Sequence, residues 1–119
     1  MIEKQEAIRI LEGFQRYYDK QNHEAFEKYQ CLTVRDERSA CKEIACYAFK
    51  RRLRENKETD IFKIIQQFKD HYEELIKTDE AMEDIKLRAN HTMMLAAIKV
   101  LEKRFRTIEK NKLRKEGAS

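Results

Sequence analysis

Metal sites in helical proteins need histidine, cysteine or acidic residues at fixed spacings, and this sequence lacks those spacings. The three histidines are His23, His71 and His91. None of them follows a glutamate by three positions, which is how di-iron carboxylate bundles arrange their ligands. We therefore expect no metal site and no cofactor.

The cysteines also lack a recognisable pattern, because their number is odd and their spacing fits neither a zinc site nor a disulfide framework. They are Cys31, Cys41 and Cys46. Cys41 and Cys46 lie five positions apart, about 140° around a helix, so one helix face cannot present both to a metal ion. Reduced and mostly buried thiols are the expected state.

Catalytic motifs built on glycine are missing as well. The two glycines, Gly13 and Gly117, are too few for a Gly-rich phosphate loop or a nucleophile elbow. Lys42 adjoins Cys41, but consecutive helical residues point about 100° apart, so this lysine is poorly placed to activate the thiol. We expect no enzymatic activity and no catalytic residue.

One group of charged residues does have a regular spacing. Five cations follow the pattern i, i+4, i+7, i+11 and i+15 and form a basic ridge along a helix: Lys99, Lys103, Arg106, Lys110 and Arg114. Such a ridge suits a nucleic-acid backbone or an acidic protein surface. It is equally typical of the solvated face near a helix C-terminus, where the helix dipole favours cations. The sequence leaves both interpretations open.

An apolar stripe lies opposite the basic ridge. It consists of Met94, Ile98, Leu101, Phe105 and Ile108, which are spaced as short heptads. A helix from residue 79 to about residue 115 would be roughly 55 Å long, against about 27 Å for the helix expected before it. The second half of the stripe would project beyond that neighbour and needs cover from a long first helix or from another chain. We predict that these five residues form a homodimer interface, with a long first helix as the alternative cover.

The elements that position these residues are expected to be helices. The chain has no proline, two glycines, 40% charged residues and 41% hydrophobic residues. Turn formers are too scarce for a β-rich fold, and apolar residues are too common for a disordered chain. The net charge of +4 is modest, and it is the C-terminal region that is basic.

The first half of the chain contains two or three helices. Residues 2–32 form either one long helix or two helices separated by a break at residues 19–22, since the same apolar stripe continues across that polar stretch. Thr33 then begins the next helix, with Asp36 three residues later in a variant of the capping box.

The second half contains two further helices. A short loop at residues 55–58 implies that the third helix runs antiparallel to its predecessor, and Thr59 is its predicted cap. The apolar residues of this helix fall on one narrow arc, which makes it the clearest helix in the sequence. Thr78 or Asp79 begins the last helix.

The segment from Met93 to Leu101 is the most apolar stretch of the chain and is interrupted only by Lys99. Two apolar stripes overlap in it, the one described above and a second one formed by Met82, Ile85, Ala89, Met93, Ala96 and Val100. A helix that is apolar on nearly all sides must be covered on nearly all sides, so we expect this segment at the centre of the fold.

These elements predict an all-α fold, an antiparallel bundle of four helices with a fifth as the alternative, ending in a long C-terminal helix. A chain of 119 residues is long enough for one core, so residues 1–115 are expected to form a single helical domain. Residues 116–119 are expected to be a disordered tail.

The sequence carries no signal peptide and no membrane-spanning segment, and we expect a cytoplasmic protein. The function that fits these features is that of a small non-enzymatic interaction or adaptor protein that self-associates through its long C-terminal helix. The alternative is a nucleic-acid-associated or regulatory protein that uses the basic ridge. The sequence does not identify a protein partner.

Overall fold

The computed structural model describes residues 2–29 and 34–117. Within them the chain forms five helices and no strand: α1 (Lys4–Tyr29), α2 (Val34–Glu55), α3 (Ile61–Ile76), α4 (Asp79–Glu83) and α5 (Ile85–Gly117). The predicted all-α fold with a long C-terminal helix is confirmed. The described residues form five helices, and the fifth arises from the division of the predicted last helix and not from a break within residues 2–32. Cys31 and the predicted cap at Thr33 lie outside the described residues.

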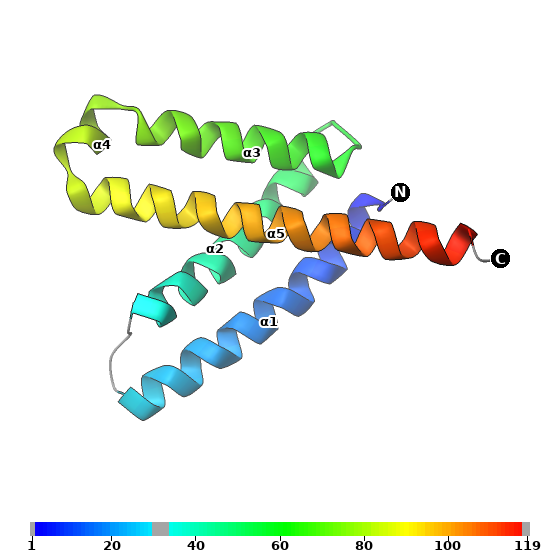
Figure 1. The fold of residues 1–119 in the computed structure, drawn as a ribbon, viewed down its shortest axis with the longest axis horizontal. Helices are drawn as coiled ribbons and strands as arrows, with labels where there is room; N and C mark the ends of the chain where they lie inside the picture. The colour runs from blue at the N-terminus through cyan, green and yellow to red at the C-terminus, as the bar shows by residue number, and fades with distance from the viewer. Residues whose placement is uncertain (1, 30–33, 118–119) are drawn as a thin grey trace.

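The helices are arranged as two antiparallel pairs that cross each other (Figure 1). α1 and α2 lie side by side and form one pair, and α3 and α5 form the other. α5 passes across both α2 and α1, so the two pairs share one crossing region and diverge away from it. The fold is correspondingly flat, with extents of 52 × 38 × 23 Å.

α1 is a single helix of 26 residues, so the polar stretch at residues 19–22 does not break it. Its buried stripe runs from Ala7 through Leu11 to Tyr18 on one face, and this continuous apolar contact holds the helix together. Gly13 lies inside the helix, and a Cβ atom added to it would meet nothing within 4 Å. The glycine therefore does not serve a close helix contact there.

α3 buries a single face, as predicted. Its buried residues are Ile61, Ile64, Ile65 and Phe68, while the polar residues on the other side are exposed. The prediction of Thr59 as its cap is wrong by one position, because the Asp60 side chain accepts a hydrogen bond from the backbone N–H of Phe62 at 2.9 Å. Asp60 has the extended backbone of an N-cap residue.

The predicted last helix is divided in two. Thr78 caps the short helix α4, and Asp84 then adopts an extended conformation that ends it. The Asp84 carboxylate accepts hydrogen bonds from the backbone N–H groups of Lys86 and Leu87, and this caps the start of α5. α5 has 33 residues, about 50 Å, and it continues through Gly117 into the segment expected to be a disordered tail.

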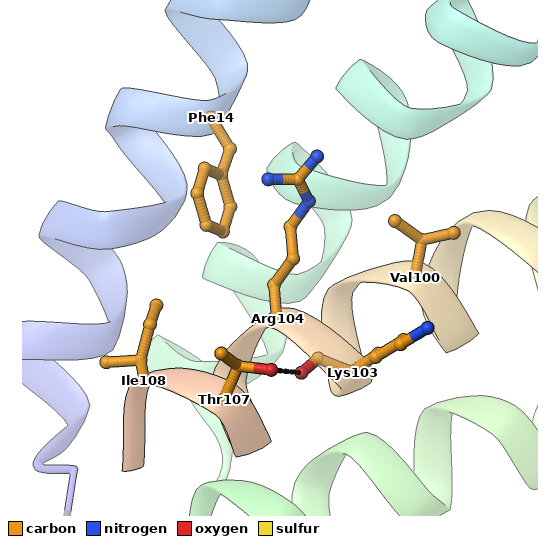
Figure 2. A pocket seen from close by; sticks show the side chains of 6 residues that line it. All are labelled: Phe14, Val100, Lys103, Arg104, Thr107 and Ile108. Atoms are coloured by element: carbon orange, nitrogen blue, oxygen red, sulfur yellow. Dashed lines mark hydrogen bonds between the residues drawn. The ribbon is translucent and has the colours of Figure 1, made fainter. Parts of the chain in front are cut away.

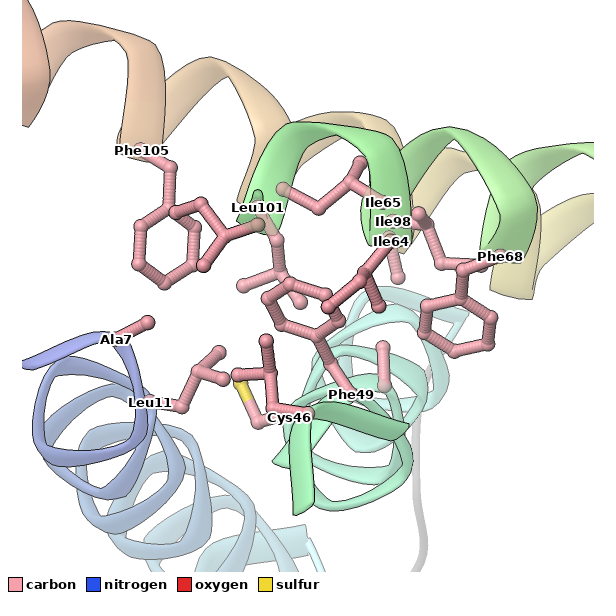
Figure 3. Close-up of a cluster of buried hydrophobic side chains, with 14 of the residues drawn as sticks. Ala7, Leu11, Cys46, Phe49, Ile64, Ile65, Phe68, Ile98, Leu101 and Phe105 are labelled. Carbon is pink, nitrogen blue, oxygen red and sulfur yellow. The ribbon is translucent and has the colours of Figure 1, made fainter. Parts of the chain in front are cut away.

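The core lies where the two helix pairs cross, and it consists of buried aromatic and aliphatic side chains from both pairs (Figure 3). Phe49 of α2 is the central residue. Its ring stacks with Phe68 of α3 at 6.3 Å between centroids and meets Phe105 of α5 edge to face at 5.8 Å. One aromatic cluster thus joins three helices.

The Met93–Leu101 segment is covered on one side only, which corrects the expectation that it is enclosed. Met94 and Ile98 are buried, but Ala96 and Lys99 are exposed. α3 runs alongside α5 and α2 crosses behind it in the view of Figure 1, and Ala96 and Lys99 lie on the side that neither helix covers. The second apolar stripe of this helix is therefore left largely in solvent.

Candidate functional site: the exposed surface of α5

The stripe predicted to be a homodimer interface lies in the core of the single chain. Met94, Ile98, Leu101 and Phe105 are buried, and Ile108 is partly buried against the same core. Their assignment to a surface for a second copy is corrected, because these side chains are already covered by α1, α2 and α3. Truncating or charging them should disturb the fold rather than an interface.

The part of the stripe that extends past α3 is covered by α1. Phe14 meets Phe105 edge to face, with 6.3 Å between ring centroids. Farther along, the Lys112 ammonium pairs with the Glu6 carboxylate at 3.0 Å. Both contacts come from the first half of α1, which therefore lies beside the overhanging part of α5.

The basic ridge is exposed along its whole length. Its members are Lys99, Lys103, Arg106, Lys110 and Arg114. Within the described residues none of the five forms an ion pair, whereas Lys69 pairs with Glu102 and Lys112 with Glu6. The Arg106 guanidinium lies 4.5 Å from the centre of the Phe62 ring, a cation–π contact that fixes the side chain on the surface. The ridge is thus a row of available positive charge.

A groove of about 530 Å³ runs beside the ridge, between α5 and α1 (Figure 2). It is lined by Phe14, Val100, Lys103, Arg104, Thr107 and Ile108. The Arg104 guanidinium lies 5.3 Å from the centre of the Phe14 ring, so the charged group and the aromatic surface are adjacent. Sequence reasoning missed this groove because it depends on the pairing of α1 with α5.

Glu102 of α5 does not neutralise the groove, whereas Glu109 lies farther along the helix beside Arg106, Lys110 and Arg114. Glu102 points to α3, where it accepts the ammonium of Lys69 at 2.9 Å, and both side chains are less than one fifth exposed. No acidic residue lines the groove. The positive charge of Lys103 and Arg104 is therefore uncompensated locally, and it favours an anionic ligand.

The second apolar stripe is the other exposed feature of α4 and α5. Ile85 is 84% exposed and Met82 is 58% exposed. Ala89 and Ala96 are also exposed, while Met93 is partly buried against the core. This stripe precedes the basic ridge along the helix, so α5 presents apolar surface near its start and basic surface near its end.

The buried thiol of Cys46 and the phenol of Tyr18 stay protonated at neutral pH. Burial raises the pKa of the Cys46 thiol to about 12, so the thiol is protonated at neutral pH and is a poor nucleophile. Burial also raises the pKa of the Tyr18 phenol, although the nearby Arg104 guanidinium opposes this. Among the described residues the Tyr18 hydroxyl is buried, and the Arg104 guanidinium is the charged group that acts on it. Cys41 is buried too.

In the described ranges, no three histidine, cysteine or acidic side chains lie together in a way that would hold a metal ion. None of the helices described combines the length and the apolar character needed to cross a membrane. Comparison of the chain with protein-family models, with curated proteins and with solved structures finds no match.

Proposed function

We propose that this chain is a small cytoplasmic interaction protein without enzymatic activity, and that it binds anionic protein partners along α5. The observation that carries the proposal is the basic ridge, whose five cations are exposed and form no ion pair within the described residues. A row of uncompensated cations raises the local concentration of anionic partners and speeds their association. The adjoining groove supplies apolar contact next to the charge.

A charge-reversal experiment tests this proposal. The ridge variant carries Lys103→Glu, Arg106→Glu and Lys110→Glu, and its matched control carries the same three reversals at exposed lysines elsewhere, Lys57, Lys63 and Lys77. Fluorescein-labelled polyglutamate is the probe, and fluorescence anisotropy at low salt is the readout. We expect binding to the wild type and the control, and loss of binding in the ridge variant. Equal affinity for both variants would contradict the proposal.

Nucleic acid is a second candidate for the same surface. The observation that favours it is the linear arrangement of the ridge, together with the guanidinium–ring contact of Arg106 and Phe62. Binding would be largely independent of sequence, and with five phosphates contacted the logarithm of affinity should fall with the logarithm of salt at a slope of roughly −4 to −5 on duplex DNA. Anisotropy without any binding to duplex DNA, single strands or RNA at low salt would remove this candidate.

Self-association remains a prediction, and the second apolar stripe is the surface through which two copies would associate. Ile85 and Met82 leave large apolar side chains in solvent, and the exposed alanines between Ile85 and Val100 would let a second helix approach closely. Light scattering at micromolar concentration measures the mass directly. If the second apolar stripe forms a dimer interface, Ile85→Glu should give a monomer that keeps its helical content. A wild-type mass near 14.4 kDa would contradict self-association.

A further inference from the structure

The groove between α1 and α5 combines apolar lining with positive charge. Phe14, Val100 and Ile108 supply the apolar surface, and Lys103 and Arg104 line the same groove (Figure 2). We propose that it binds an acidic amphipathic helix of a partner protein. This inference rests on the proposed function, because it assigns a class of partner to the basic surface of α5.

The acidic character of the partner follows from charge complementarity. The groove contains two cations and no carboxylate. Glu102 pairs with Lys69 at 2.9 Å, and Glu6 pairs with Lys112 at 3.0 Å. Glu109 lies farther along α5, beside Arg106, Lys110 and Arg114, and does not line the groove. Carboxylates that neutralise Lys103 and Arg104 must therefore come from the ligand.

The helical and amphipathic character follows from the apolar lining. Val100 and Ile108 are eight residues apart on α5, about 12 Å along the helix axis. An amphipathic helix that carries anchors at i, i+3, i+4 and i+7 presents apolar side chains over roughly the same length, about 10.5 Å. Phe14 lies across the groove from them on α1. A nucleic-acid backbone would leave this apolar surface uncovered, so the geometry favours a helix.

Two peptides of identical composition test the proposal. The first is a labelled 15-residue helix with leucines at i, i+3, i+4 and i+7 and glutamates on the remaining face. The second is a scramble that carries the same charge without an apolar stripe. Because the burial of even one large apolar side chain changes affinity by about tenfold or more, we expect the amphipathic peptide to bind at least that much more tightly.

A groove-filling substitution locates the binding. Thr107 is exposed, lines the groove and donates its hydroxyl to the Lys103 carbonyl at 3.0 Å, so Thr107→Trp should fill the groove without changing charge. Thr92→Trp is its matched control, since Thr92 is exposed on the same helix and makes the same bond to the Arg88 carbonyl at 2.8 Å. Thr107→Trp should remove the preference for the amphipathic peptide, and Thr92→Trp should preserve it.

The possible outcomes separate this inference from the proposed function. Equal binding of the two peptides, or an unchanged preference in Thr107→Trp, would overturn the groove as a helix site and leave the ridge as a general anion surface. Tighter binding of duplex DNA or RNA than of the amphipathic peptide would also overturn it. If polyglutamate and both peptides all fail to bind at low salt, the proposed function falls together with the inference.

Discussion

Phe14 of α1 and Phe105 of α5 pack edge to face, with ring centroids 6.3 Å apart and ring planes inclined by 67°. The two rings belong to residues 91 positions apart in the sequence, and both pack in or against the same core. Phe105 contacts Phe49 of α2 as well, at 5.8 Å. One face of α5 is thereby buried in the fold, and the opposite face is exposed.

Charging the committed face should unfold the chain. Phe105 is 0% exposed, so Phe105→Glu would bury an unpaired carboxylate among aromatic rings at a cost of several kcal/mol. We expect loss of the cooperative thermal transition followed by circular dichroism. Ile85→Glu is the control on the exposed stripe and should change stability by less than about 0.5 kcal/mol. A folded Phe105→Glu protein that merely changes its mass would show that the stripe faces another copy.

Because α3 buries a single face, we expect substitutions on its two faces to differ in their effect on stability. Ile64→Asp or Phe68→Asp should unfold the protein, because both side chains are buried among apolar residues and the new carboxylate would lose its hydration. Ile64→Asp is the sharper of the two, since the Arg52 guanidinium lies 4.5 Å from the centre of the Phe68 ring and would partly compensate a carboxylate there. Gln66→Ala and Glu74→Ala, at exposed positions of the same helix, should stay within about 0.5 kcal/mol of the wild type. Comparable destabilisation by both kinds of substitution in thermal melts would mean that the helix is rotated.

Gly13→Ala should stabilise the protein. The added Cβ would meet nothing within 4 Å, and alanine in a helix interior is favoured over glycine by up to about 1 kcal/mol. Urea denaturation should show a higher midpoint with an unchanged slope. A lower midpoint would reveal a close contact at Gly13 that the fold described above does not contain.

Cys46 should make the fold sensitive to alkaline pH. Its pKa in the folded protein is about 12, above the ordinary value of 9.0, because the thiol is buried. Below pH 9 both states keep the proton and stability is unaffected. Between pH 9 and pH 12 the unfolded chain loses the proton while the folded chain keeps it, so stability falls by up to ~1.4 kcal/mol per pH unit.

Urea denaturation at pH 8, 9 and 10 measures this loss, and Cys46→Ala supplies the baseline because it cannot titrate. We expect a steeper decline in the wild type than in the variant. The Tyr18 phenol, whose pKa burial also raises, adds a decline in both proteins above its own ordinary pKa. Parallel pH profiles for wild type and variant would show that the Cys46 thiol is solvated in the folded state.

Features governed by local periodicity were predictable from the sequence. The buried arc of α3 follows from apolar residues at helical spacing, and the exposure of Lys103 and Arg106 follows from their place opposite a strong apolar stripe. The break at Asp84 was not predictable in the same way. Met82 and Ile85 continue the helical apolar pattern across it, so the pattern concealed the cap that Asp84 provides.

The helix that covers the apolar stripe of α5 could not be predicted from local sequence, because the cover depends on which helices pair in the tertiary structure. A stripe that contains Leu101 and Phe105 is equally well buried by another helix of the same chain or by a second copy. The contacts that decide it come from Phe14 and Glu6, which precede the polar stretch at residues 19–22, so the pairing of α1 with α5 and not the continuity of α1 provides the cover. The groove at Phe14 and Arg104 has the same origin, since it exists only where α1 lies beside α5.

A double-mutant cycle on Phe14 and Phe105 tests most directly whether α1 of the same chain covers α5. The cycle uses Phe14→Leu, Phe105→Leu and the double variant, with unfolding free energies measured in urea at protein concentrations tenfold apart. Edge-to-face packing predicts a coupling energy of about 0.5–1.5 kcal/mol that is the same at both concentrations. A coupling near zero, or one that grows with protein concentration as a contact between two copies would, contradicts the account.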